Sequence, residues 1–266
     1  MIDPVALKLG PLTIYWYGVM VATAFASGLY LIRLRVQNKK NITFEQSSDL
    51  AIAGLVGAII GARIFYVLTN LSIYLKDPLQ IIRIDKGGLV FYGGMIGAIA
   101  VIIFLCKKHN YNIREIADLF TPSLVLGQAI GRIGCLINGC CFGKACSNFL
   151  GIHYSSGSLA HQIQLQKGII LPTATQPLAV YPTQFFSTLL HLTLLIFLLL
   201  ADKKKHKHGI IFCYYLIVYG TFRFFVEFLR GDYINMYGPF TIAQIICMII
   251  VPIGTFFLFK IKQLKT

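Results

Sequence analysis

The chain has 266 residues, of which 56% are hydrophobic and only 13% are charged, and its mean hydropathy is +0.71. This composition excludes an ordinary soluble globular domain and indicates a protein that resides in a lipid bilayer. The formal charge of +14 at pH 7 does not indicate a nucleic-acid partner, because Lys and Arg collect in alternate loops between apolar stretches.

Seven stretches are long and apolar enough to cross a bilayer, since a spanning helix needs about 20 mostly apolar residues. Their approximate ranges are 12–34, 48–70, 88–106, 117–136, 182–201, 209–228 and 239–259. The first stretch has neither a short charged leader nor a small-residue cleavage site, which favours a retained helix over a signal peptide. We therefore predict an all-α polytopic membrane protein in which residues 1–266 form a single membrane-embedded domain.

The distribution of basic residues predicts the orientation of the chain. Fourteen Lys and Arg lie in the loops and tail that follow the first, third, fifth and seventh stretches, whereas seven lie on the opposite side. The side richer in Lys and Arg is normally cytoplasmic. We therefore expect the N-terminus outside and the C-terminus in the cytoplasm, with the basic loops close to anionic lipid headgroups.

One insert is large enough to form a small external head. Residues 137–180 mix Gly, Ser, Pro and short β-prone pieces between the fourth and fifth stretches. On the same face, residues 71–87 suggest a short surface helix followed by a turn. Small residues recur in "AIAGLVGAIIGARIFY" from Ala51 and "GGLVFYGGMIGAIA" from Gly87, which predicts close helix packing.

Three arginines interrupt the apolar stretches, namely Arg63, Arg132 and Arg223. A charged side chain at membrane depth is costly, so each is a candidate functional residue. In the expected topology all three lie toward the external half of their helices, and guanidinium groups bind phosphate through paired N–H groups. We therefore expect a site for the anionic group of a lipid; the alternative is a purely structural charge network.

Other polar side chains lie near these arginines in the sequence. Glu227 follows Arg223 by four residues, which permits an ion pair on one helix face. Arg230 follows at the boundary, where its side chain can reach the headgroups. Tyr92 lies between glycine pairs that leave its hydroxyl group room to face a cavity, and the stretch "YPTQFF" opens the fifth helix.

Six motifs occur in a fixed order along the chain: "WYG" at 16–18, "GARIFYV" at 61–67, "GGLVFYGGMIGA" at 87–98, "GRIGCLINGCCFG" at 131–143, "YPTQFF" at 181–186 and "RFFVEFLRGD" at 223–232. In these motifs the chain resembles the prolipoprotein diacylglyceryl transferases, over nearly its whole length. The resemblance implies a multi-pass enzyme of the bacterial plasma (inner) membrane with seven helices and an external head. The implied reaction moves the diacylglyceryl group of phosphatidylglycerol onto the lipobox cysteine of a prolipoprotein, forming a thioether and releasing glycerol phosphate.

The resemblance also implies roles for individual residues. The family's essential arginine corresponds to Arg132, its signature asparagine and glycine to Asn138 and Gly139, and its early tyrosine to Tyr17. The catalytic residues expected are Arg132, Tyr92, Arg223 and Glu227. The substrate-binding residues expected are Tyr17, Arg63, Asn138, Gly139, Tyr181, Gln184 and Arg230. The expected partners are phosphatidylglycerol, prolipoprotein signal peptides with a lipobox cysteine and the bilayer itself, with no nucleic acid, no cofactor and a monomeric chain.

Four positions depart from the best-known members of the family. Those members carry histidine at positions 92 and 181, asparagine at 135 and glutamate at 140, where this chain has Tyr92, Tyr181, Cys135 and Cys140. Because of these departures, three ways in which the acceptor thiol could lose its proton remain open. Tyr92 could accept the proton if the arginines lie beside it, Glu227 could accept it, or the thiol could ionise in the positive field without a strong base.

Four cysteines, Cys135, Cys140, Cys141 and Cys146, surround the end of the fourth stretch. Disulfides or packed thiols, a redox or metal-linked role, and direct participation in catalysis are all open for them. Their C-x4-C-C-x4-C spacing is not a standard zinc pattern, so no metal is expected from the sequence. A non-catalytic lipid-binding paralogue and a thiol-redox membrane protein are the competing functions, while a transporter is disfavoured because two matching halves with broken helices are missing from the sequence.

Overall fold

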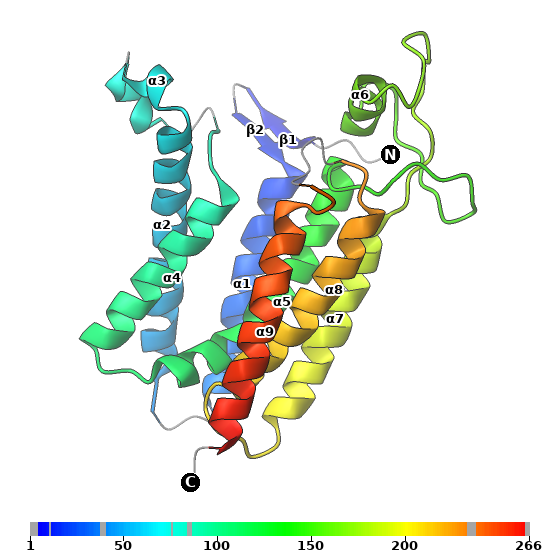
Figure 1. Cartoon of the computed structure of the whole chain (residues 1–266). Coiled ribbons are helices and arrows are strands. Elements are labelled where there is room, and N and C mark those ends of the chain that lie inside the picture. The colour runs from blue at the N-terminus through cyan, green and yellow to red at the C-terminus, as the bar shows by residue number, and fades with distance from the viewer. Residues whose placement is uncertain are drawn as a thin grey trace. The chain divides into compact units, whose positions relative to one another are not determined.

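The computed structural model describes residues 5–10, 12–37, 41–75, 77–83, 87–232 and 238–263 (Figure 1). Five basic residues used to predict the topology lie outside this part of the chain: Lys39, Lys40, Lys76, Lys86 and Lys265. The chain divides into two compact units. The first combines Met1–Leu31 with Ala117–Thr266, and the second is Ile32–Ile116. The prediction of a single domain is not tested by this division and stays a prediction.

Seven helices of the described chain are long and apolar enough to cross a membrane, which confirms the predicted all-α polytopic class. They are α1 (Trp16–Val36), α2 (Phe44–Thr69), α4 (Phe91–Lys108), α5 (Ile113–Asn138), α7 (Thr183–Asp202), α8 (Ile210–Leu229) and α9 (Ile242–Gln263). Large apolar side chains such as Phe225, Phe256 and Phe259 are more than half exposed on them. Such surfaces suit contact with lipid tails.

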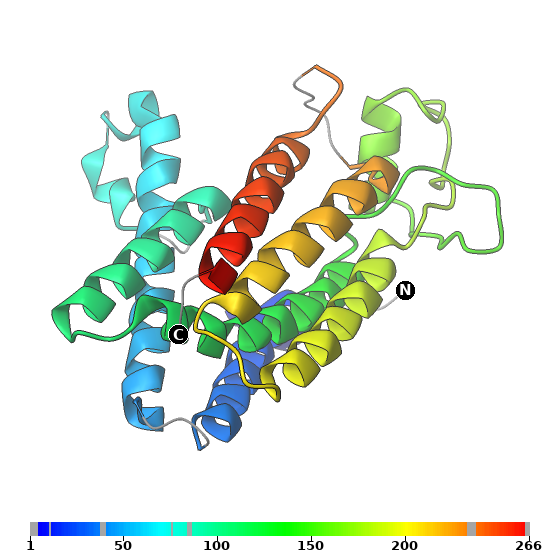
Figure 2. The same ribbon diagram turned by 60° about the horizontal axis from the view of Figure 1, so that its bottom comes forward.

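In the first unit, α5, α7 and α8 run side by side (Figures 1 and 2), and α8 also packs against α9. Val125, Leu194, Leu198, Ile211 and Tyr215 form a buried cluster shared by α5, α7 and α8. The start of α8 is capped from a neighbouring helix. The carboxylate of buried Asp118 on α5 accepts the N–H groups of Gly209 at 2.6 Å and Phe212 at 2.8 Å.

In the second unit, α2 packs closely on α4, as the small residues in both helices predict. A Cβ atom added at Gly61 would lie 2.4 Å from the carbonyl oxygen of Gly93, and one at Gly97 would lie 2.3 Å from that of Gly57. Side chains are therefore excluded at this crossing. The short helices α3 (Leu71–Tyr74) and η1 (Pro78–Ile81) follow α2, which confirms the predicted short helix. The predicted turn includes residues 84–86, which lie outside the described residues.

The N-terminal residues correct one predicted boundary. The first helix begins at Trp16 rather than at residue 12, because β1 (Val5–Leu9) and β2 (Leu12–Tyr15) pair as an antiparallel hairpin. Gly10 has a φ of +57° beside the reversal, a conformation that glycine adopts at little cost. The apolar character of residues 12–15 is thus used in a strand, where alternate side chains face opposite ways.

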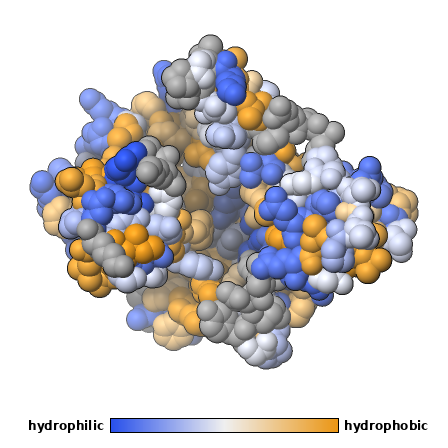
Figure 3. All heavy atoms as spheres, turned by 90° about the horizontal axis from the view of Figure 1, so that it is seen from above, coloured by the Kyte–Doolittle hydropathy of each residue, from blue (hydrophilic) through white to orange (hydrophobic). Residues whose placement is uncertain are grey.

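The segment between α5 and α7 has its own small core of Phe142, Tyr154, Ala160, Ile163 and Val180. It contains a helix that the sequence reading missed, α6 (Leu159–Gln166), whose N–H of His161 bonds to the capping Ser158 side chain at 3.3 Å. The expected β-prone pieces form only isolated bridges within the described part, such as Ile152 with Val180. Hydrophilic and hydrophobic side chains mix on this segment, seen at the right of Figure 3.

Candidate active site

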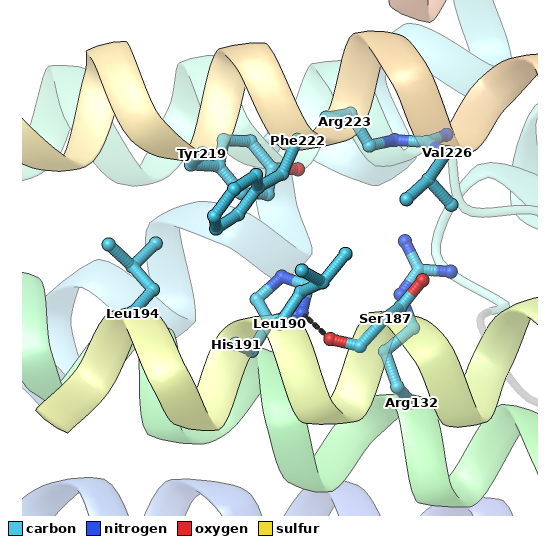
Figure 4. Close-up of a pocket in the computed structure, with 9 residues that line it drawn as sticks. All are labelled: Arg132, Ser187, Leu190, His191, Leu194, Tyr219, Phe222, Arg223 and Val226. Carbon is cyan, nitrogen blue, oxygen red and sulfur yellow. Dashed lines mark hydrogen bonds between the residues drawn. The ribbon is translucent and has the colours of Figure 1, made fainter. Parts of the chain in front are cut away.

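A pocket in the first unit brings together side chains from three spanning helices (Figure 4). Arg132 comes from α5, Ser187 and His191 from α7, and Arg223 from α8. The rest of its lining is mostly apolar: Leu190, Leu194, Tyr219, Phe222 and Val226. Two guanidinium groups thus face one space between membrane helices, where electrostatic interactions are poorly screened.

Arg132 is half-buried, yet no carboxylate of the described residues lies within 4.0 Å of its guanidinium group. A cation at this depth without a carboxylate partner has unsatisfied charge and up to five N–H donors. An anionic ligand with several oxygens, such as a phosphate, satisfies both.

Arg223 and Arg230 are organised by a single buried carboxylate. Glu227, with 3% of its surface exposed, forms an ion pair with Nη1 of Arg223, which confirms the predicted pairing four residues apart. Nη1 of Arg230 lies 4.0 Å from the same carboxylate oxygen, and the other oxygen accepts a 2.8 Å hydrogen bond from Thr241. Arg230 also bonds to Asp232 through Nε at 2.9 Å. Glu227 therefore fixes the positions of two guanidinium groups.

His191 is the functional candidate that the sequence reading missed. It is 7% exposed, and its Nδ1 lies against the main-chain oxygen of Ser187, one turn earlier (Figure 4). A carbonyl can only accept, so Nδ1 is the donor in this contact. The signal was available, since histidine is an ionisable residue within an apolar span, the same rule that selected the arginines.

The motif after Arg132 ends its helix with a left-handed residue. Gly139 has a φ of +69°, and the N–H of Cys140 returns to the carbonyl oxygen of Cys135 at 3.1 Å. Asn138 is the last residue of α5 and is exposed. This turn brings the thiols of Cys135, Cys140 and Cys141 to within 4.8 Å of one another.

The first turn of α7 holds the cysteine turn in place. The Gln184 side-chain amide donates to the carbonyl oxygen of Cys140 at 2.7 Å, and the Thr183 hydroxyl donates to that of Cys141 at 2.7 Å. Gln184 also donates to Tyr154 at 3.1 Å. Burial raises the pKa of Tyr154 to about 12, so this phenol is neutral at ordinary pH.

Cys141 has an unusual backbone and an unusual thiol. Its φ is +65°, a left-handed conformation that costs a non-glycine residue on the order of 1–3 kcal/mol. Hydrogen bonds from the Cys135 and Cys140 thiols lower the pKa of the Cys141 thiol, as do the positive charges of Arg230 and Arg132, against the effect of burial. All seven cysteines are free thiols, so of the alternatives that the sequence left open the structure does not show the disulfides.

Main-chain bonds place the cysteine turn next to the end of α8. The N–H of Gly143 donates to the carbonyl of Tyr181 at 2.8 Å, that of Lys144 to Leu229 at 2.8 Å, and that of Gly231 to Phe142 at 3.1 Å. The Tyr181 hydroxyl accepts a bond from Asn148 at 3.1 Å.

Tyr17, at the start of α1, belongs to the same neighbourhood. Its ring approaches α5 at Gly134, and its phenol interacts electrostatically with the three cysteines and with Arg132.

Arg63 and Tyr92 belong to the second unit. Arg63 is 8% exposed and donates to four main-chain oxygens, with its guanidinium group also over the rings of Tyr66 and Tyr74. Those oxygens are on Gln80, Ile81, Gly87 and Gly88, at 2.6 to 3.1 Å. These contacts make Arg63 the organiser of the loop before α4, and a role in lipid binding stays a prediction. Tyr92 is half-buried in the first turn of α4, with its ring edge-on to Phe91.

The fold and the pocket define a multi-pass membrane protein with a cationic site between its helices. A family model described as "Prolipoprotein diacylglyceryl transferase" matches residues 4–260. The chain is 31% identical to the phosphatidylglycerol--prolipoprotein diacylglyceryl transferase of Clostridium tetani, over 98% of each chain. Similar enzymes of Clostridium perfringens (34%, covering 96% of this chain and 93% of the relative) and Bacillus cereus (35%, covering 97% and 91%) also match.

The chain belongs to the prolipoprotein diacylglyceryl transferase family. It is therefore a multi-pass membrane transferase of lipoprotein biosynthesis, as the order of its motifs predicts.

Proposed function

We propose that this chain transfers the diacylglyceryl group of phosphatidylglycerol to the lipobox cysteine of prolipoproteins, forming a thioether and releasing glycerol phosphate. The observation that carries the proposal is the half-buried Arg132, which faces Arg223 across a mainly apolar pocket and has no carboxylate partner in the described chain. The relatives from Clostridium and Bacillus are named for phosphatidylglycerol and prolipoprotein, which supports this donor and this acceptor.

Arg132 and Arg223 bind the phosphate of the donor lipid. As the glycerol carbon–oxygen bond breaks, negative charge grows on the leaving phosphate, and guanidinium groups already in place stabilise it without reorganisation. Glu227 is a positioning residue, because its carboxylate holds Arg223 and lies 4.0 Å from Arg230.

The remaining predicted residues take several roles. Tyr17, Asn138, Tyr181 and Arg230 lie around the cysteine turn or beside Arg132, and they line the approach of the lipid headgroup and the peptide. Gly139 and Gln184 are buried and support this site, Gly139 through its left-handed turn and Gln184 through its bond to Cys140. In the second unit, Arg63 orders the loop before α4, and Tyr92 keeps the catalytic role proposed for it from the sequence.

The proposed setting is the plasma membrane of a bacterium, with a monomeric chain, the N-terminus outside and residues 137–180 forming an external head. The excess of Lys and Arg in alternate loops supports this orientation. The external leaflet then supplies phosphatidylglycerol to the pocket, and the signal peptide enters laterally from the bilayer.

The test uses purified protein, phosphatidylglycerol vesicles and a synthetic lipobox peptide, with mass spectrometry of the peptide. We expect a diacylglyceryl adduct on the cysteine and a matching yield of glycerol phosphate. The adduct should vanish with Arg132→Ala and persist with Arg114→Ala, an exposed arginine on the same helix. Phosphatidylglycerol binding without any adduct would contradict the proposal and favour a lipid-binding relative without activity.

A further inference from the structure

Three of the four motif cysteines form one cluster. The Sγ atoms of Cys135, Cys140 and Cys141 all lie within 4.8 Å of one another, and all three residues are half-buried. Cys146 lies elsewhere, with its N–H bonded to Ala179 and its sulfur against Gly151. The phosphate pocket accounts for the arginines but leaves this cluster without a function.

Buried side chains fix the main chain of the cluster. Thr183 and Gln184, which are 1% and 0% exposed, bond to the carbonyl oxygens of Cys141 and Cys140. Two buried side chains therefore hold the main chain of the cluster in place.

The backbone conformation of Cys141 favours a chemical role for this residue over a packing role. At a φ of +65° glycine would fit without strain, so a packing role gives no reason for cysteine at this position. Three thiols cannot all be consumed in one disulfide. A role that uses all three sulfur atoms together accounts for both observations.

We propose that Cys135, Cys140 and Cys141 bind one Zn²⁺ ion and leave its fourth position open for the acceptor thiol. With Zn–S bonds of about 2.3 Å, tetrahedral sulfur ligands lie roughly 3.8 Å apart, which a modest contraction of the cluster reaches. Three thiolates around Zn²⁺ carry one net negative charge. Arg230 and Arg132 both act electrostatically on Cys141 and compensate that charge.

The chemistry of the open position rests on the proposed function. The lipobox thiol binds zinc as a thiolate and releases its proton to water, so no strong side-chain base is needed. Its sulfur electron pair forms the bond to the glycerol carbon. The carbon–oxygen bond to the phosphate breaks, and the oxygen keeps that electron pair in the glycerol phosphate released. Zinc is neither oxidised nor reduced.

The first experiment measures metal binding without reference to activity. The full-length protein in detergent, dialysed against buffered Zn²⁺, should retain about one zinc ion per chain by mass spectrometry of the metal, and Co²⁺ in its place should give thiolate-to-cobalt absorption bands. Cys141→Gly, which suits the left-handed backbone, should fold and lose both signals. Cys146→Ser should keep them. Absence of zinc from the fully reduced wild-type protein, or equal zinc in both variants, would overturn the proposal.

The second experiment connects the metal to the reaction and separates the two proposals. Stripping zinc with a chelator should slow adduct formation about a hundredfold or more, and added Zn²⁺ should restore it. Full activity of the stripped enzyme would overturn the zinc proposal and leave the transferase proposal standing. Zinc bound through the three cysteines without any adduct from zinc-loaded enzyme would overturn the catalytic role of the metal together with the transferase proposal.

Discussion

The charged side chains within the spanning helices differ in how far the protein satisfies them. Arg63 gives its N–H groups to four carbonyl oxygens, and Arg223 is paired with Glu227. Arg132 has neither kind of partner in the described chain. A buried cation without a partner does not stabilise the fold. We therefore assign Arg132 to the binding of an anionic ligand.

Replacing Arg132 with lysine should therefore act on the chemistry and not on the fold. Lysine keeps the charge but loses the paired N–H geometry, and we expect adduct formation to fall about a hundredfold. The rate is measured with phosphatidylglycerol vesicles and a lipobox peptide. Arg114→Lys on the same helix should retain the wild-type rate, and an equal loss in the two variants would count against a phosphate role for Arg132.

Tyr154 gives a prediction for alkaline pH. Its pKa is about 12 in the folded protein against 10.0 for the free phenol, because burial disfavours the charged form. Its contribution to stability is thus complete below pH 10 and is lost as the pH rises toward 12. Thermal unfolding in detergent should therefore show a steeper loss of stability above pH 10 for the wild type than for Tyr154→Phe. Parallel curves would show that Tyr154 titrates normally.

At the scale of secondary-structure elements, the closest contact is the crossing of α2 and α4. The main chains meet at Gly57, Gly61, Gly93 and Gly97, with no space for a Cβ atom. This packing has a different origin from the apolar cluster of α5, α7 and α8, where side chains interlock. In lipid, close main-chain approach compensates for the missing hydrophobic drive.

Gly61→Ala should consequently separate α2 from α4 and lower the unfolding temperature in detergent. The added Cβ would lie 2.4 Å from a main-chain oxygen, which cannot move independently of its helix. Gly127→Ala on α5 is the matched control, since its nearest neighbours lie at 4.0 Å. There the better helix propensity of alanine, about 1 kcal/mol, should leave stability unchanged or raised. The reverse order of the two variants would disprove the packing account.

For the whole molecule, hydropathy predicts the seven spans because each must be apolar over the thickness of a bilayer. The hairpin of β1 and β2 was missed because its apolar residues continue directly into α1, so composition does not change at Trp16. His191 was missed although, like the arginines, it is an ionisable side chain within an apolar span. The gathering of the three cysteines depends on two left-handed residues, Gly139 and Cys141, which linear spacing does not reveal.

The orientation of the whole chain is open to a direct test. Green fluorescent protein fused to the C-terminus should fluoresce in living bacteria, and alkaline phosphatase fused there should be inactive, because the C-terminus is expected in the cytoplasm. A phosphatase placed after Gly157, in the loop before α6, should be active if that segment is external. The opposite pattern would invert the topology and place the cysteine cluster on the cytoplasmic side.

The left-handed backbone at Cys141 also affects which residues evolution can accept at this position. Two requirements at this position oppose each other. The left-handed backbone favours glycine or asparagine, whereas binding through a thiol requires cysteine. A lineage that lost its need for the sulfur would lose cysteine there readily and gain stability as it did so. Among relatives, the identity of this one residue should therefore change together with positions 135 and 140, and the three should be kept or discarded as a set.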